Sequence, residues 1–106
     1  YNRTNYDKPN INKISKEIVS LAASKATNAV AGVNHEREIK LSKDKEGFIL
    51  DVFIDADFGV KIPQLAWDIQ NSVKEAVEST TQQKVKAVNI HVQGVMMPQE
   101  GSRINE

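Results

Sequence analysis

Three aspartates near the middle of the chain have the residue type and spacing to bind a cation or transfer a proton. Asp51, Asp55 and Asp57 fall on one face of an extended stretch, because successive strand side chains point to opposite faces. Side chains two residues apart on one face are about 7 Å from each other. Asp55 and Asp57 could therefore coordinate a hard cation or form an acid–base pair. Phe53 shares this face and is an unusual neighbour for a hydrated acidic site. The alternative interpretation is that the aspartates keep an open sheet soluble and discourage wrong strand pairing.

The two histidines are the other candidates for metal binding or catalysis. His35 and His91 have neither the i, i+4 spacing nor the short-loop spacing of a metal pair. His91 shares a strand face with Asn89 and Gln93, but a solvated strand histidine explains the same pattern. The chain has no cysteine, and no serine lies in a nucleophile elbow. We therefore predict no catalytic residues, no metal and no cofactor, and a protein that is not an enzyme.

Trp67 is the strongest single candidate for contact with another protein. It falls outside the apolar stripe of its predicted helix and close to Asn71 and Lys74. Tryptophan is enriched among the residues that dominate protein interfaces, so we expect Trp67 to contribute to such a surface. The alternative is that its ring folds over the edge of the helix and covers the core.

Charge and hydropathy exclude several classes of partner. Lysine plus arginine and aspartate plus glutamate both number 14, so the formal net charge is zero, and basic residues alternate with acidic ones. This pattern argues against nucleic acid as a partner. No apolar run approaches the roughly 18 residues of a membrane-spanning helix, and the polar start of the chain is not a secretory signal. We expect a cytoplasmic domain without direct membrane insertion.

The elements that position these residues follow from apolar periodicity. A helix is expected to begin at Ser15, a good N-cap, and to stop at Gly32. A charged turn at 43–47 separates two strands of a hairpin, a second helix starts near Pro63, and a last strand runs over about 85–96. The residues expected to face the core are Ile18, Leu21, Ala22, Ala26 and Ala29 in the first helix, Phe48, Leu50, Val52, Ile54, Ala56 and Phe58 in the second strand, and Ile62, Leu65, Ala66, Ile69, Val73, Ala76 and Val77 in the second helix.

A short strand over Ile11–Ile14 would complete a β-α-β-β-α-β order. That order predicts an α+β fold, a two-layer sandwich with two helices on one face of a mostly antiparallel or mixed sheet. The ordered domain is expected over residues 11–97. It lies between a flexible N-terminal segment at 1–10, where Pro9 disfavours a helix, and a flexible C-terminal tail at 98–106.

Three segments together resemble the alkaline shock protein family, an envelope stress response family of Gram-positive bacteria. They are ISKEIVSLAA followed by AVAGV, then DVFIDADFGVKIPQLAWDIQNSV, then VKAVNIHVQGV. The resemblance covers roughly residues 10–95. One departure is that family members usually open with a glycine before the first strand, whereas this chain has Asn10 there.

The resemblance implies a non-enzymatic protein of the cytoplasm that serves cell-envelope homeostasis and the stress response. It also implies self-association, and association with a membrane-anchored protein of the same family that would hold the chain near the inner face of the membrane. The predicted interaction surface then consists of Trp67, Phe53, Asp55, Asp57, His91 and Gln93, and the strand end at Val95–Met97 is expected to take part in recognition as well. Some relatives are linked to fatty-acid metabolism, which implies an alternative: a small-ligand or regulatory protein with an apolar pocket between helix and sheet.

Overall fold

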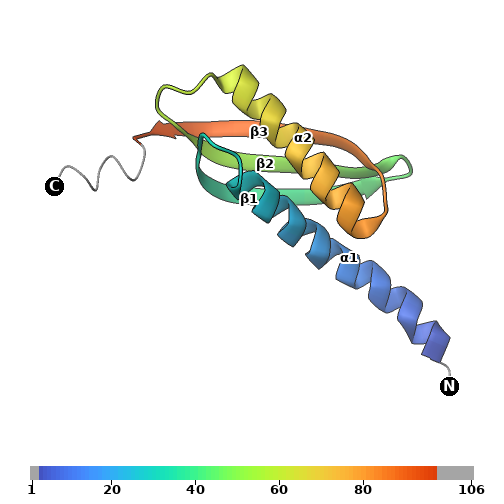
Figure 1. Ribbon diagram of the computed structural model, residues 1–106. Helices are drawn as coiled ribbons and strands as arrows, with labels where there is room; N and C mark the ends of the chain where they lie inside the picture. Colours follow the sequence, from blue (N-terminus) through green and yellow to red (C-terminus); the bar gives the residue numbers. More distant parts are fainter. Residues whose placement is uncertain (1–2, 98–106) are drawn as a thin grey trace.

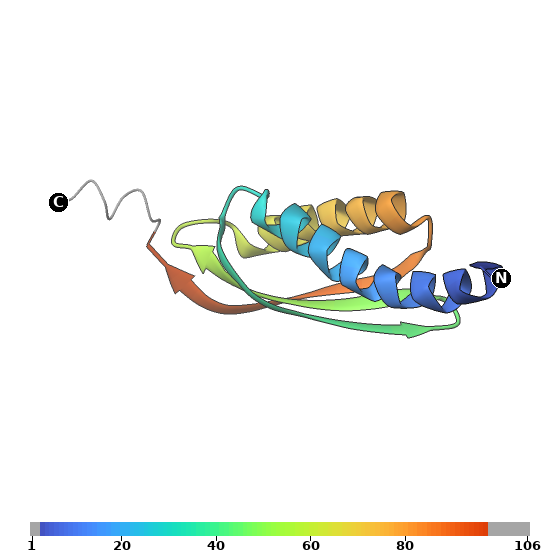
Figure 2. The ribbon, with the colours of Figure 1, turned by 90° about the horizontal axis from the view of Figure 1, so that it is seen from below.

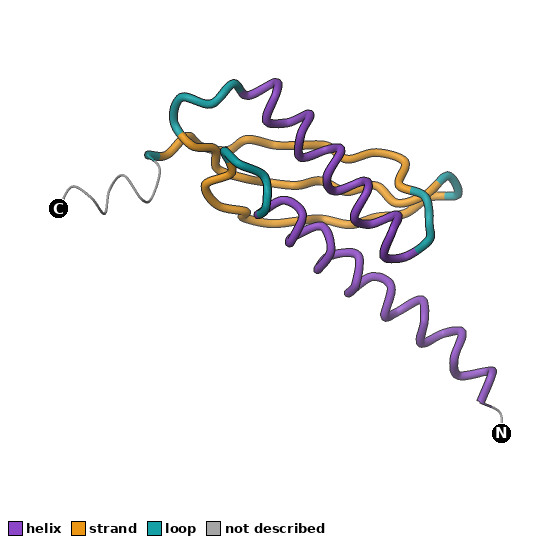
Figure 3. The backbone as a smooth tube through the Cα atoms, viewed as in Figure 1, coloured by secondary structure: helices purple, strands orange, loops and turns teal. Residues whose placement is uncertain are grey.

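The computed structural model describes residues 3–97, and the side chains of residues 16–97. Within this range the elements follow in the order α1 (Arg3–Asn28), β1 (Val33–Asp44), β2 (Gly47–Asp57), α2 (Ile62–Thr81) and β3 (Val85–Met96) (Figure 1). Short loops join these elements at the two ends of the sheet (Figure 3).

The strands form one mixed sheet in the order β1-β2-β3, with β2 in the centre. β2 is antiparallel to β1, as in any hairpin, and parallel to β3, because α2 carries the chain back over the sheet between them. Both helices lie on one face of the sheet, which we call the inner face. The outer face is left uncovered by the described part of the chain (Figure 2). The predicted α+β class and two-layer architecture are confirmed.

The predicted strand at Ile11–Ile14 is wrong, because these residues belong to α1. Their spacing explains the error: Ile11, Ile14 and Ile18 recur at i, i+3 and i+7, which is a helical period and not the alternation of a strand. α1 also begins well before Ser15 and passes through Pro9, so proline does not keep this segment out of the helix. Residues 98–106, the expected flexible tail, lie outside the described range.

The core lies between the helices and the inner face of β2. The buried β2 side chains alternate as predicted, each at most 3% exposed: Phe48, Leu50, Val52, Ile54 and Ala56. The buried side chains of α2 recur every four residues: Leu65, Ile69, Val73 and Val77. Phe58 was predicted to belong to this core and does not, since it is 68% exposed. β2 ends at Asp57, and Gly59 turns the chain with a φ of 95°.

The buried row of α1 is offset from the predicted one. Val19, Ala23 and Thr27 are fully buried, whereas Ile18 and Leu21 are 37% and 57% exposed. Thr27 can be buried because its hydroxyl donates a hydrogen bond to the Ala23 carbonyl at 2.8 Å. Small residues therefore face the core from α1, and the larger apolar residues lie outside it.

Candidate interaction surfaces

A polar and aromatic cluster, which we call the outer cluster, occupies the centre of the outer face. The register of β2 and β3 sets His91 beside Phe53 and Asn89 beside Asp51. The rings of Phe53 and His91 stack, with centroids 4.4 Å apart and planes inclined by 11°. Asp51 Oδ1 lies 2.9 Å from His91 Nε2 and accepts a hydrogen bond from Asn89 Nδ2 at 3.2 Å. Lys40 Nζ lies 5.4 Å from the Phe53 ring centroid.

Hydrogen bonds hold the carboxylate of this cluster in its charged form. The pKa of Asp51 is lowered from its ordinary value, first by the hydrogen bond with His91 and next by the one from Asn89. Both of these groups are thereby engaged with Asp51, while His91 is exposed and Phe53 is half-buried. The cluster is suited to contact with another molecule and has no activated nucleophile.

Asp55 is not on the exposed surface, although it was predicted to be part of the interaction surface. It is 3% exposed, and both of its carboxylate oxygens accept from Arg37 Nε at 3.0 Å. Gly94 lies beside it on β3, where an added Cβ would be 2.9 Å from Asp55 Oδ1. The glycine therefore makes room for the buried carboxylate of this ion pair.

Asp57 has a separate partner from Asp55. Its Oδ1 accepts a hydrogen bond from Asn34 Nδ2 at 2.9 Å, and the same amide lies 3.2 Å from the Met97 carbonyl. The two carboxylates thus do not converge on a shared cation position. Among the side chains of residues 16–97, no group of three or more histidine, cysteine, aspartate and glutamate residues could hold a metal ion.

Gln93 and His35 lie in exposed, separate positions. The pairing of β2 with β3 passes from Ile54↔Val92 to Asp55↔Gly94, so Gln93 is the extra residue of a bulge. His35 pairs with Asp55 from the β1 side and takes no part in the outer cluster.

Trp67 is exposed on α2, at 61% of its surface. Its ring lines a shallow cleft of about 390 Å³ with Pro63 and Gln64. Its carbonyl accepts a hydrogen bond from Asn71 Nδ2 at 3.0 Å, which is a local contact of the helix. Of the two interpretations of Trp67, the structure supports the exposed one, because a ring that covered the core would be largely buried.

An apolar patch, which we call the apolar end, lies where β2 and β3 finish. The Phe58 amide donates a hydrogen bond to the Met96 carbonyl at 2.7 Å, so the two strand ends stay paired beyond Asp57. The exposed apolar side chains there are Phe58 at 68%, Val95 at 52%, Met96 at 46% and Met97 at 67%. The strand end at Val95–Met97 was predicted to take part in recognition, whereas Phe58 was predicted to belong to the core. The signal was Gly59, which ends the strand one residue earlier than the alternation suggests.

The sequence matches the model of the ASP23 family, described as a family with a cell envelope-related function, over residues 11–97. It is 26% identical to YqhY of Bacillus subtilis over 72 residues and 28% identical to Spy1535 of Streptococcus pyogenes serotype M6 over 99 residues. It is 36% identical to YloU of Bacillus subtilis over 62 residues. All three relatives are described as uncharacterized proteins.

The alignment covers 68% of this chain for YqhY, 78% for Spy1535 and 58% for YloU. The chain spans about half the length of two of these relatives, 53% of YqhY and 52% of YloU, and 77% of Spy1535.

Solved structures of the MamM CTD share the fold. One superposes with a TM-score of 0.55 at 19% identity and covers 74% of this chain and 94% of the MamM chain. Another, a zinc form, has a TM-score of 0.54 at 18% identity and covers 74% and 85%. At this identity the likeness establishes the arrangement of elements alone. Neither α1 nor α2, over the residues described, has the apolar length required to cross a membrane.

Proposed function

Because the chain belongs to the alkaline shock protein family, ASP23, whose function is related to the cell envelope, we propose that it is a non-enzymatic envelope stress protein that works by self-association. The contact joins the apolar ends of two copies. The outer cluster and Trp67 are further surfaces, available to a partner of the same family that is anchored in the membrane. Such a partner would hold this chain at the inner face of the membrane.

The exposure of the apolar end is the observation that carries this proposal. Its four large apolar side chains are 46–68% exposed and belong to residues at the paired ends of β2 and β3. Exposed apolar side chains gathered at one end of a sheet mark an interaction site more often than single scattered side chains do. None of these four side chains is charged, and the Asp57 carboxylate beside Met96 accepts a hydrogen bond from Asn34. Two copies can bring the apolar side chains together across a two-fold axis, the self-complementary arrangement of most dimers.

A non-enzymatic role is supported by the state of the acidic residues. The β2 aspartates that could have formed a catalytic or metal site each have a partner: His91 and Asn89 for Asp51, Arg37 for Asp55, and Asn34 for Asp57. These pairs stabilise the sheet and leave no carboxylate of the three poised to take a proton from a substrate.

The alternative of a ligand-binding protein of lipid metabolism requires an apolar cavity between the helices and the sheet. The described side chains fill that space, since Ala23, Val52 and Ile69 meet there with no exposed surface. The alanines of α1 pack against the core instead of leaving room for an acyl chain. No observation on the described residues favours this alternative.

Sedimentation velocity of the full chain tests self-association. We expect the wild type to form dimers or larger species at about 100 μM. Phe58→Ser and Met97→Ser should each weaken the association by roughly tenfold, since a central apolar contact contributes about 1–2 kcal/mol or more. Leu21→Ser is the matched control: its side chain is 57% exposed on α1, outside the apolar end, and its loss should leave association unchanged.

Two results would contradict the proposal. One is a wild type that remains monomeric throughout this range. The other is a loss of association in Leu21→Ser equal to that in the variants of the apolar end. Trp67→Ala separates the surfaces: we expect it to keep self-association and to reduce recovery of family partners in affinity purification. If it changes neither property, Trp67 is not part of an interaction surface.

A further inference from the structure

A group of lysines gathers at the hairpin end of the sheet, opposite the apolar end. Lys45 comes from the turn between β1 and β2, Lys74 from α2, and Lys84 and Lys86 from the chain that enters β3. These four lysines line one open cleft of about 550 Å³ together with Glu46 and Val85. The sequence alternates basic and acidic residues, so only the fold reveals that these lysines line one cleft.

The backbone holds the walls of this cleft in place. The Phe48 amide at the start of β2 donates a hydrogen bond to the Lys84 carbonyl at 2.9 Å. Gly47 approaches the same carbonyl so closely that an added Cβ would be 2.5 Å from it. The hairpin turn and the segment before β3 are thus fixed against each other, and the cleft is a built feature of the fold.

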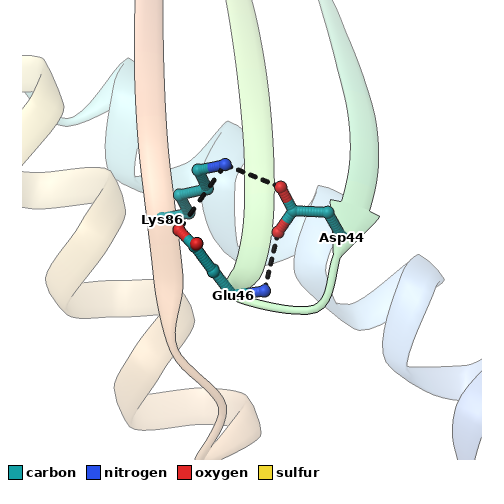
Figure 4. Close-up of polar contacts among 3 residues, drawn as sticks. All are labelled: Asp44, Glu46 and Lys86. Atoms are coloured by element: carbon teal, nitrogen blue, oxygen red, sulfur yellow. Dashed lines mark hydrogen bonds and ion pairs between the residues drawn. The ribbon is translucent and has the colours of Figure 1, made fainter.

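Charge in the cleft is only partly balanced. Lys86 Nζ lies 2.7 Å from Asp44 Oδ2 and 3.6 Å from Glu46 Oε1, and the Glu46 amide donates to Asp44 Oδ1 at 2.7 Å (Figure 4). Among the described side chains, Lys45, Lys74 and Lys84 take part in no ion pair.

Glu78 is the other acid near these lysines. It lines an adjoining cleft with Lys74 and Lys84, and its Oε2 accepts a hydrogen bond from the Val85 amide at 2.9 Å. That hydrogen bond directs the carboxylate toward the backbone. The lysines without an ion-pair partner among the described side chains therefore outnumber the two carboxylates beside them, those of Glu46 and Glu78.

We propose that this cleft binds a phosphate group, carried either by a small solute or by a lipid headgroup. Lysine ammonium groups are common phosphate ligands, and three of them from separate elements can surround one anion. The volume of the cleft exceeds that of a single phosphate and accommodates the group to which the phosphate is attached. This site lies away from the apolar end, so it does not depend on self-association and can be occupied in a monomer or a dimer.

A titration of the full chain with inorganic phosphate, followed by amide chemical shifts in NMR, tests the cleft directly. We expect saturable shifts at Lys45, Lys84 and Lys86. Lys45→Gln, Lys74→Gln and Lys84→Gln should each weaken binding about fivefold, the factor that corresponds to about 1 kcal/mol for one lysine near an anion. Lys25→Gln is the control, because Lys25 is exposed in the last turn of α1. Glu78→Gln keeps an acceptor for the Val85 amide, removes a negative charge and should strengthen binding.

Sedimentation with vesicles distinguishes the two sources of phosphate. Binding to phosphatidylglycerol vesicles but not to phosphatidylcholine vesicles, lost in the lysine variants, identifies a lipid headgroup. Saturable phosphate binding without vesicle binding identifies a small solute. The proposal is overturned if phosphate produces no saturable shifts, if Lys25→Gln weakens binding as much as the cleft variants do, or if Glu78→Gln weakens it.

Discussion

Side chains on both faces of β2 are buried, but the contacts that bury them differ between the two faces. On the inner face five apolar side chains are at most 3% exposed and pack against both helices. On the outer face, which no described element covers, Asp55 is equally buried, but both of its oxygens accept from the single Nε–H of Arg37, and a glycine on the next strand leaves room for the carboxylate. The packing of the inner face depends on the volume of its apolar side chains and tolerates substitutions that conserve this volume. The burial of Asp55 on the outer face depends instead on its contacts with Arg37 and Gly94.

The largest expected effect compares one residue type on the two faces. Ile54 is fully buried on the inner face, and Ile49 is partly exposed on the outer face of the same strand. Ile54→Ala should lower the free energy of unfolding by about 2–5 kcal/mol, because it removes buried apolar surface and leaves a cavity. Ile49→Ala should lower it by about 1 kcal/mol or less. Chemical denaturation measures both, and equal losses would mean that the outer face is covered in solution.

The next largest loss of stability is expected from disruption of the ion pair between Arg37 and the buried Asp55. Arg37→Ala leaves the Asp55 carboxylate buried without its partner, and we expect a loss of roughly 2 kcal/mol, reduced from the usual range for buried pairs because Arg37 is half exposed. Gly94→Ala should cost about 1–3 kcal/mol, since the new methyl group displaces the carboxylate. The double variant should cost less than the sum of the two, because both changes disrupt one contact. Additive losses would show that Gly94 and the ion pair are independent.

A smaller loss is expected from the aromatic stack of the outer cluster. Phe53→Leu keeps apolar bulk and removes the stacking with His91, which contributes about 1 kcal/mol. Trp67→Ala, an exposed aromatic residue with no ring partner among the described side chains, should change stability by less than about 0.5 kcal/mol. Thermal unfolding measures the stability of both variants. We expect a loss for the Phe53 variant, whose ring stabilises the sheet, and none for the Trp67 variant, whose ring is available to a partner.

The smallest effect is a pH dependence. The pKa of Asp51 is lowered from 3.8 in the folded state, so the ionised carboxylate adds stability above that value, and this contribution is lost as the pH falls through the folded pKa. The difference in stability between wild type and Asp51→Asn should therefore be largest near neutral pH and should shrink below about pH 4. Urea unfolding at several pH values measures it, and a difference that grows on acidification would contradict this assignment.

Most of the fold was predictable because its signals are local. The alternation in β2 identified its five buried side chains and failed only at Phe58, beyond the end of the strand, and the apolar stripe predicted for α2 contains all four of its buried residues. α1 was harder, because its buried row is Val19, Ala23 and Thr27 while larger apolar residues lie outside the core. Its small residues allow α1 to pack closely against the core. Such residues contribute little to an apolar periodicity, so the buried row was not predicted.

The candidate surfaces were predictable only where one residue type gave a signal. Trp67 and Phe53 were identified from their chemistry alone. The burial of Asp55 was not, because it requires Arg37 on one neighbouring strand and a bulge that sets Gly94 on the other. The placement of Lys45, Lys74 and Lys84 around one cleft likewise depends on three segments that are distant in sequence. Such groupings follow from strand register and crossover geometry, which a single sequence does not specify.

The position of β2 between an antiparallel and a parallel neighbour also has consequences for folding. β1 can pair with β2 as a hairpin within microseconds, whereas β3 must wait until α2 has formed and the longer connection has closed. Until then the second edge of β2 is open and could accept β3 from another chain, which is the route to a domain-swapped dimer. β3 contributes to both proposed surfaces, the apolar end and the lysine cleft. Both therefore become complete only in this last step, and a chain that stalls before it can use neither.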